Sequence, residues 1–189
     1  MYEYMKMPNR IISTERLGLR HWLESDIVPL AQMNSDKQVM QYFPNTLSFD
    51  ESVEMLNRIN NHFNGNSFGL YAVELKSTNE FIGFTGFSIP GFETDFTPCI
   101  EIGWRFRKEV LGNGYATEAA RACLQYGFET LKFDTILSFT AVPNKPSEKL
   151  MKRIGMQYLG RFEHPKIEKD HPLCEHVLYQ STREDYSKA

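Results

Sequence analysis

Two glycines, Gly112 and Gly114, precede a segment in which apolar residues recur at three- and four-residue steps. This periodicity predicts an amphipathic helix that begins just after the second glycine. The first amides of a helix have no intrahelical partner, and the helix dipole is positive at that end. Glycines keep side chains away from such amides. We therefore expect a phosphate-bearing ligand to bind the backbone of Leu111, Gly112, Asn113, Gly114, Tyr115 and Ala116.

Two common phosphate-binding motifs do not fit this loop. In the dinucleotide fingerprint G-x-G-x-x-G, the third glycine would fall at Thr117. The Gly-Lys-Ser/Thr of a Walker loop is absent. A pair of glycines before a helix also occurs in plain turns, so the neighbouring motifs have to decide the interpretation.

Three further motifs stand in a fixed order around the loop. They are Glu101-Ile102-Gly103-Trp104, then Tyr115-Ala116-Thr117-Glu118-Ala119, then Asn144-x-x-Ser147 followed by Arg153-Ile154-Gly155-Met156. This combination resembles the GNAT (Gcn5-related N-acetyltransferase) superfamily, specifically its ribosomal-protein-acetylase-like (RimJ/RimL) branch. The resemblance covers nearly the whole chain, from about residue 14 to about residue 180.

The resemblance implies that acetyl-CoA is the cosubstrate and that a primary amine attacks its thioester. The glycine loop would then hold the pyrophosphate, and the exposed backbone edge at Trp104, Arg105 and Phe106 would hold the pantetheine arm. We expect the side chains of Trp104 and Phe106 themselves to lie in the core. Asn144 could bond the pantetheine amide, or it could merely shape the turn before Pro146.

The reaction requires control of two protons. An amine near pH 7 is mostly an ammonium and must lose a proton before it attacks. Glu101 is the candidate base or ammonium anchor, because it faces away from the apolar stripe of its strand and burial would raise its pKa. The alternative is a strand carboxylate that pairs with Arg105 or another cation. The resemblance places Ser147 where a hydroxyl could meet the thiolate sulfur, although an N-terminal helix cap or a first-turn serine would also explain the residue.

Residues 162–176 join two expected strands and are longer than a hairpin requires. Long loops in compact domains are often functional, and an imidazole beside an amine could take its proton. His164, His171 and His176 are therefore candidate acceptor-binding residues that rival Glu101 as the base. A solvated loop with scattered histidines, or a dimer contact, is the alternative.

Metal and thiol chemistry are not expected. His171, Cys174 and His176 share one loop and strand start without a second cluster of ligands. Neither Cys99 nor Cys123 has a nearby histidine that would mark a nucleophile. Three cysteines are an odd number, which favours a reduced, cytoplasmic protein.

The overall composition indicates an ordinary globular protein. A chain of 189 residues with 41% hydrophobic content can form a single domain over residues 1–189. A net charge of −3 offers no electrostatic attraction for nucleic acid or anionic lipid. No apolar run approaches the length of a membrane span, and the first residues lack a signal-peptide core.

The predicted fold is mixed α/β (α+β): a twisted mixed sheet of about seven strands, with helices on both faces and splayed parallel central strands. Alternating or β-rich runs predict strands at residues 14–20, 68–75, 81–87, 99–106, 135–142, 158–162 and 175–180. Gly103, inside one strand, suggests a bulge or a close backbone approach. A capping box at Ser48 and Glu51 predicts a helix that Gly65 would end.

These observations predict an acetyl-CoA-dependent N-acetyltransferase. The branch suggests a protein or peptide N-terminus as acceptor, although relatives also acetylate aminoglycosides, polyamines and amino acids. The alternative from a different class is a non-catalytic acyl-CoA-binding sensor or interaction module. Neither a nucleic-acid nor a membrane partner is expected, and monomer and homodimer are both open.

Overall fold

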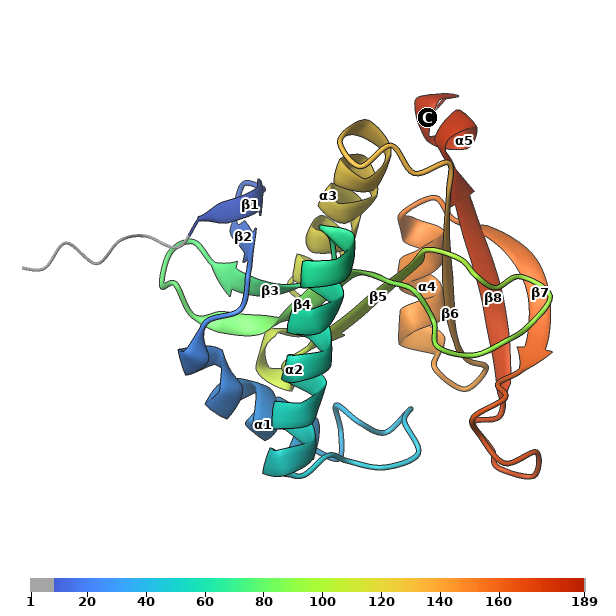
Figure 1. Cartoon of the computed structure of the whole chain (residues 1–189), viewed down its shortest axis with the longest axis horizontal. Helices are drawn as coiled ribbons and strands as arrows, with labels where there is room; N and C mark the ends of the chain where they lie inside the picture. Colours follow the sequence, from blue (N-terminus) through green and yellow to red (C-terminus); the bar gives the residue numbers. More distant parts are fainter. Residues whose placement is uncertain (1–8, 189) are drawn as a thin grey trace, which may run out of the picture.

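The computed structural model describes residues 9–188, and its eight strands form one sheet (Figure 1). In chain order they are β1 (Arg10–Ser13), β2 (Leu17–Arg20), β3 (Leu70–Leu75), β4 (Phe81–Ser88), β5 (Glu101–Phe106), β6 (Thr135–Ala141), β7 (Gln157–Glu163) and β8 (Glu175–Thr182). Their spatial order is β1-β2-β3-β4-β5-β6-β8-β7. Every neighbouring pair is antiparallel except β5 and β6, which are parallel.

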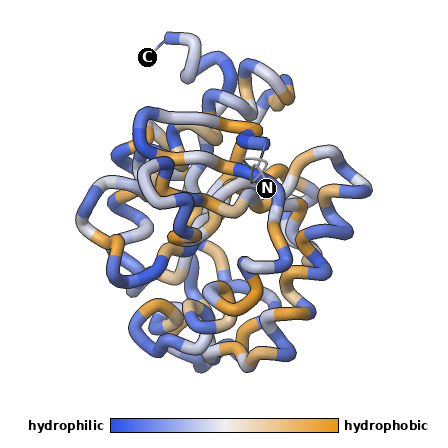
Figure 2. Tube along the Cα trace, turned by 90° about the vertical axis from the view of Figure 1, so that its left-hand side faces the viewer, coloured by the Kyte–Doolittle hydropathy of each residue, from blue (hydrophilic) through white to orange (hydrophobic). Residues whose placement is uncertain are grey.

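Helices lie on both faces of the sheet, as predicted. They are η1 (Glu24–Asp26), α1 (Ile27–Ser35), α2 (Phe49–Asn66), η2 (Lys108–Val110), α3 (Tyr115–Glu129), α4 (Lys145–Arg153) and α5 (Arg183–Lys188). In Figure 1, α2 lies in front of the sheet and α3 behind it. Hydrophobic and hydrophilic residues alternate along the chain (Figure 2). Between residues 9 and 188, no helix is long and apolar enough to cross a membrane.

The larger core lies between the sheet and α3. Tyr71 and Ile102 project from the sheet, and Cys123, Leu124 and Phe128 project from α3; all five are at most 2% exposed. A smaller core on the opposite face joins α1 to the sheet through Leu30, Met33, Ala72, Phe81 and Phe84. Strand β5 is thereby fixed between two packed layers.

The element boundaries differ from the sequence prediction at several ends. The expected first strand begins at Leu17 rather than Thr14, because the Thr14 hydroxyl accepts a hydrogen bond from the Leu17 amide (2.9 Å) in a turn. An eighth strand, β1, precedes that turn. Helix α2 starts at the predicted capping box but continues through Gly65, and Ser67 ends it with a φ of 61°. Helix α5 has no counterpart among the elements predicted from the sequence.

The parallel strands β5 and β6 are paired only where they begin. Glu101 opposite Leu137 is their one register pair, and the Leu137 amide donates to the Ile100 carbonyl (2.8 Å). The Ser138 hydroxyl then donates to the Ile102 carbonyl (2.9 Å). Beyond this point the two strands diverge (Figure 1), which confirms the predicted splay.

The bulge predicted at Gly103 is wrong. Strand β5 pairs with β4 in one unbroken register, with Gly103 directly opposite Gly86. A Cβ at Gly103 would meet nothing closer than the Glu101 Oε1 atom at 3.9 Å, so no backbone approaches closely there. The facing glycines instead leave a patch of sheet without side chains.

Candidate active site

Strand β5 presents different side chains to the two faces of the sheet. Ile102 and Phe106 belong to the large core on the α3 face. Arg105 is the register partner of Phe84, which packs in the small core on the α1 face. Directly opposed residues of a ladder share a face, and side chains alternate along a strand. Glu101 therefore lies with Arg105 on the α1 face, and Trp104 lies on the α3 face.

Glu101 is held at the start of the gap between β5 and β6. The Ser88 hydroxyl donates a hydrogen bond to its Oε2 atom (3.2 Å). Burial raises the pKa of Glu101 to about 7, although the bond from Ser88 opposes this effect. In the chain between residues 9 and 188 its carboxylate forms no ion pair with Arg105, so the alternative of a Glu101–Arg105 pair is wrong. A carboxyl group with this pKa can exchange a proton near neutrality.

On the opposite face, Ser147 is bonded to a side chain of β5. The Trp104 indole Nε1 donates to the Ser147 Oγ atom (2.9 Å). An indole nitrogen is only a donor, so the serine oxygen accepts in this contact and its own proton stays available. The cap of α4 is Asn144, whose Oδ1 accepts from the Ser147 amide (3.2 Å). Ser147 is therefore not required as the cap.

Both polar atoms of the Asn144 side chain form hydrogen bonds within the chain. Its Nδ2 atom donates to the Thr140 hydroxyl (2.8 Å), while its Oδ1 caps the helix. This is the turn-shaping alternative considered for Asn144. A bond to pantetheine would require one of these contacts to rearrange, and it stays a prediction.

The glycine loop has the geometry of an anion site. Gly112 and Gly114 have φ values of +84° and +79°, and no side chain caps α3. The first helical bond runs from the Glu118 amide to the Gly114 carbonyl (3.0 Å), so the preceding amides have no intrahelical partner. A Cβ at Gly112 would meet no atom within 4 Å, which shows that the loop is open. These residues fit a pyrophosphate.

Arg16, which is not among the residues predicted from the sequence, lies against this loop. Its Nη1 donates to the Asn113 carbonyl (3.0 Å), and its guanidinium lies 4.4 Å from the centre of the Tyr115 ring. It is held by an ion pair to Glu118 (2.7 Å). The contact joins residues 97 apart in sequence, so no local pattern could have revealed it.

The free edge of β5 faces the gap. The carbonyls of Ile100 and Ile102 point toward β6, so the backbone of Trp104 and Phe106 faces the same way. Across the described residues, β6 has no register partner for either of them. This edge can take an extended pantetheine arm as an added strand. The Arg105 side chain does not point into the gap but toward α1.

Two of the three candidate histidines belong to an aromatic cluster. His164 and His176 lie 4.9 Å apart between ring centroids and pack among Phe92, Phe96, Phe139 and Phe162. Burial lowers the pKa of His176 to about 4, so its ring is neutral at pH 7. His171 lies outside this cluster, and its Nδ1 accepts from the Leu173 amide (3.1 Å). The fold thus brings His164 and His176 together and leaves His171 apart from them.

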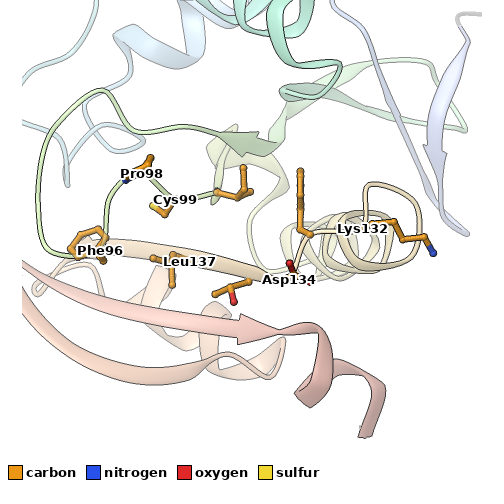
Figure 3. A pocket seen from close by; sticks show the side chains of 9 residues that line it. Phe96, Pro98, Cys99, Lys132, Asp134 and Leu137 are labelled. Carbon is orange, nitrogen blue, oxygen red and sulfur yellow. The ribbon is translucent and has the colours of Figure 1, made fainter.

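A surface pocket of about 500 Å³ opens beside the paired beginnings of β5 and β6. Figure 3 shows Phe96 and Pro98 at one end of it and Lys132 and Asp134 toward the other. It adjoins the closed end of the gap rather than the glycine loop. Burial raises the pKa of its Cys99 thiol to about 11, which makes that thiol a poor nucleophile. No group of three or more potential metal ligands occurs within residues 9–188.

Comparison with known proteins places the chain in a family. Residues 16–157 match the model of the acetyltransferase (GNAT) domain. The uncharacterized N-acetyltransferase YnaD from Bacillus subtilis (strain 168) is 32% identical over 152 residues, which cover 80% of this chain and 85% of YnaD. A GNAT-family acetyltransferase from Bacillus anthracis superposes with a TM-score of 0.76 at 28% identity, covering 92% of this chain and 98% of that one. The chain belongs to the GNAT acetyltransferase family.

Two solved structures with lower identity share the fold. One is spermidine N-acetyltransferase from Vibrio cholerae in complex with CoA and spermine (TM-score 0.73, 21% identity, 92% and 99% coverage). The other is ribosomal-protein-S5-alanine acetyltransferase from Vibrio fischeri (TM-score 0.72, 16% identity, 92% and 97% coverage). As a member of this family, the chain is an N-acetyltransferase that uses acetyl-CoA. The expected reaction class and cosubstrate are therefore confirmed.

Proposed function

We propose that this enzyme acetylates a primary amine with Glu101 and Ser147 acting from opposite faces of β5. The observation that carries the proposal is their placement: Glu101 lies on the α1 face, and the Trp104–Ser147 pair lies on the α3 face of the same strand. The gap between β5 and β6 runs along the edge of that strand. Groups on the two faces can therefore reach the two sides of one reacting centre.

Glu101 would serve the amine. An acceptor ammonium has to lose a proton before it attacks, and a carboxylate whose pKa lies near neutrality can accept that proton directly or through water. The Ser88 hydroxyl fixes one carboxylate oxygen and leaves the other for this purpose.

Ser147 would serve the sulfur. The thioester of acetyl-CoA supplies the acetyl group, and its sulfur departs with a negative charge. Because the Ser147 oxygen already accepts from Trp104, its hydroxyl proton is oriented away from the indole and can donate to that sulfur. The open amides after Gly114, with Arg16 beside them, would hold the pyrophosphate.

The RimJ/RimL resemblance supports a protein or peptide N-terminus as acceptor, and the fold shared with the Vibrio fischeri protein agrees with this. The test is a release assay for free thiol with acetyl-CoA and a panel of short peptides, polyamines, aminoglycosides and amino acids. Turnover with peptides alone would support the N-terminal acceptor. If acetyl-CoA binds with no turnover on any amine, the chain acts as a sensor module and the proposal fails.

We also propose that the enzyme is a single domain and that it works in the cytoplasm. The continuous eight-stranded sheet supports one domain over the described residues 9–188, and the ends of the proposed domain, 1–8 and 189, lie outside them. Cys99, Cys123 and Cys174 are free thiols, which supports a reducing compartment such as the cytoplasm. A monomer and a homodimer both fit this assignment.

A further inference from the structure

Arg105 is a largely enclosed cation without an acidic partner. Its Nη1 donates to the Asn34 Oδ1 atom (2.5 Å), and its guanidinium lies 4.3 Å from the centre of the Phe43 ring and 5.4 Å from that of Phe84. Its Nε atom is buried and has no hydrogen-bond partner. Burial lowers the pKa of Arg105 to about 10, which leaves it charged at neutral pH.

Arg20 shows how the same chain treats a buried arginine with a structural role. Its Nε donates to Glu74 (2.6 Å), and its two terminal nitrogens donate to Asp26 (2.6 and 2.9 Å). Every side of that guanidinium is bonded to a carboxylate. Arg105 has no carboxylate on any side in the part of the chain that the structure describes. A partly buried charge without a counter-ion is costly, so its retention calls for a ligand.

The free side of Arg105 has the geometry of a carboxylate fork. Nη1 is engaged by Asn34, whereas Nε and Nη2 have no partner among the hydrogen bonds of residues 9–188. These two N–H groups are parallel donors, and such a pair binds the two oxygens of one carboxylate. Phe43, which is 40% exposed, lies over the guanidinium and would have to turn aside to admit it.

Arg105 lies on the same face as Glu101 and four residues further along the strand. That spacing corresponds to about 13 Å between the two backbone positions. Between them stands Gly103, opposite Gly86, so the intervening sheet has no side chains to block a ligand. One molecule lying along this patch can present its amine near Glu101 and an anionic group to Arg105.

We propose that Arg105 binds the carboxylate of the acceptor, so that the enzyme prefers amines that also carry a carboxylate. This inference rests on the proposed function and names its substrate class. It predicts that cationic polyamines are poor acceptors, since their second charge would meet the guanidinium.

The test compares pairs of acceptors that differ in one group. Glycylglycine against glycylglycinamide, and glutamate against glutamine, are assayed by thiol release with saturating acetyl-CoA. For at least one pair we expect the wild type to favour the more acidic member by about tenfold or more in kcat/KM, the scale of a charge-assisted bond. Equal rates within both pairs, or faster turnover of spermidine than of either acid, would overturn the proposal.

Variants separate binding from folding. Arg105→Gln should reduce the preference for the acid to near unity and leave acetyl-CoA affinity unchanged, and Arg105→Lys should restore part of the preference. Arg107→Gln is the matched control, because Arg107 already has a carboxylate partner, Glu80 (2.5 Å). A preference that persists in Arg105→Gln contradicts the proposal. If Arg105→Gln does not fold, the wild-type pairs still decide the question.

A binding measurement distinguishes failure of this inference from failure of the proposed function. N-acetylglycylglycine, the product of one acid, is titrated into the wild-type protein loaded with CoA, which requires no turnover. Binding that weakens about tenfold in Arg105→Gln but not in Arg107→Gln supports the carboxylate site even if catalysis is absent. Equal binding of this product and its carboxamide would refute the site even in an active enzyme.

Discussion

The two faces of β5 differ in how they handle charge. The α1 face carries Glu101 and Arg105, two partly enclosed charged groups that do not pair with each other. The α3 face carries the neutral Trp104–Ser147 contact and leads to the open amides of the glycine loop. The alternation of a single strand thus separates the groups that would meet the amine from those that would meet the cofactor. Changes on one face should leave the kinetics assigned to the other intact.

The largest effect is expected at Glu101. Glu101→Gln removes the proton acceptor but keeps the side-chain shape, so turnover should fall about 100-fold while the Kd for acetyl-CoA stays the same. Steady-state kinetics and calorimetry measure the two quantities. Ser88→Ala, which removes only the bond to Oε2, should have a smaller effect. A loss of acetyl-CoA affinity in Glu101→Gln would contradict the assignment of the amine to the α1 face and of the cofactor to the α3 face.

The raised pKa of Glu101 predicts that kcat/KM increases with pH and that the stability of the fold decreases with pH. As a base it must be ionised, so kcat/KM for the acceptor should rise with pH and level off above about 7. Its folded pKa exceeds the unfolded value of 4.5, so the folded state binds more protons between these values. The stability of the wild type should therefore fall relative to Glu101→Gln as pH rises through this window. A Tm difference that is constant with pH would contradict the raised pKa.

Ser147 tests the other face. Ser147→Ala should lower turnover by about tenfold to a hundredfold, the cost of one hydrogen bond to a charged sulfur. The acceptor pH profile should keep the shape set by Glu101. Trp104→Phe retains the serine but removes its donor, and a smaller loss is expected. Full turnover in Ser147→Ala would mean that the hydroxyl only binds the indole.

Gly114 tests cofactor binding alone. Gly114→Asp places a carboxylate at the anion site and strains a residue with a φ of +79°, so acetyl-CoA affinity should fall at least about tenfold, or 1.4 kcal/mol. Gly155→Asp is the matched control, since Gly155 has a φ of +87° at the end of α4. Calorimetry should show the loss only in the first variant. Equal affinity in a folded Gly114→Asp protein would remove the loop from the cofactor site.

The smallest effects are expected at the loop histidines. Phe139 and Leu137 alternate onto the same face as Glu101, so the aromatic cluster borders the amine side of the sheet. His164→Ala should raise the acceptor KM by about threefold and leave acetyl-CoA binding unchanged, as expected for lost packing without lost chemistry. His171→Ala, outside the cluster, should match the wild type. A changed pH profile in His164→Ala would instead make this imidazole the base.

The sequence was sufficient for features that depend on local pattern. Alternation along β5 correctly placed Glu101 opposite the apolar stripe, and the glycines located the start of α3. Gly65 does not end α2 because glycine costs a helix interior only about 1 kcal/mol, which the packed remainder of the helix can offset. Contacts such as Arg16 with Asn113 arise from tertiary packing of distant segments, and they have no local signal.

Because β5 and β6 are paired only where they begin, the sheet consists of two groups of strands that few hydrogen bonds connect. Five antiparallel strands end at β5, and the group β6, β8 and β7 begins beside it. The Glu101–Leu137 register pair is the one ladder pair across this seam in the part of the chain that the structure describes, and the Leu137 amide and the Ser138 hydroxyl donate hydrogen bonds there. The Leu137 amide should therefore exchange with deuterium faster than the amides of β4, which are paired on both sides. Acetyl-CoA, by bridging the two halves, should slow that exchange and make the molecule unfold as a single unit.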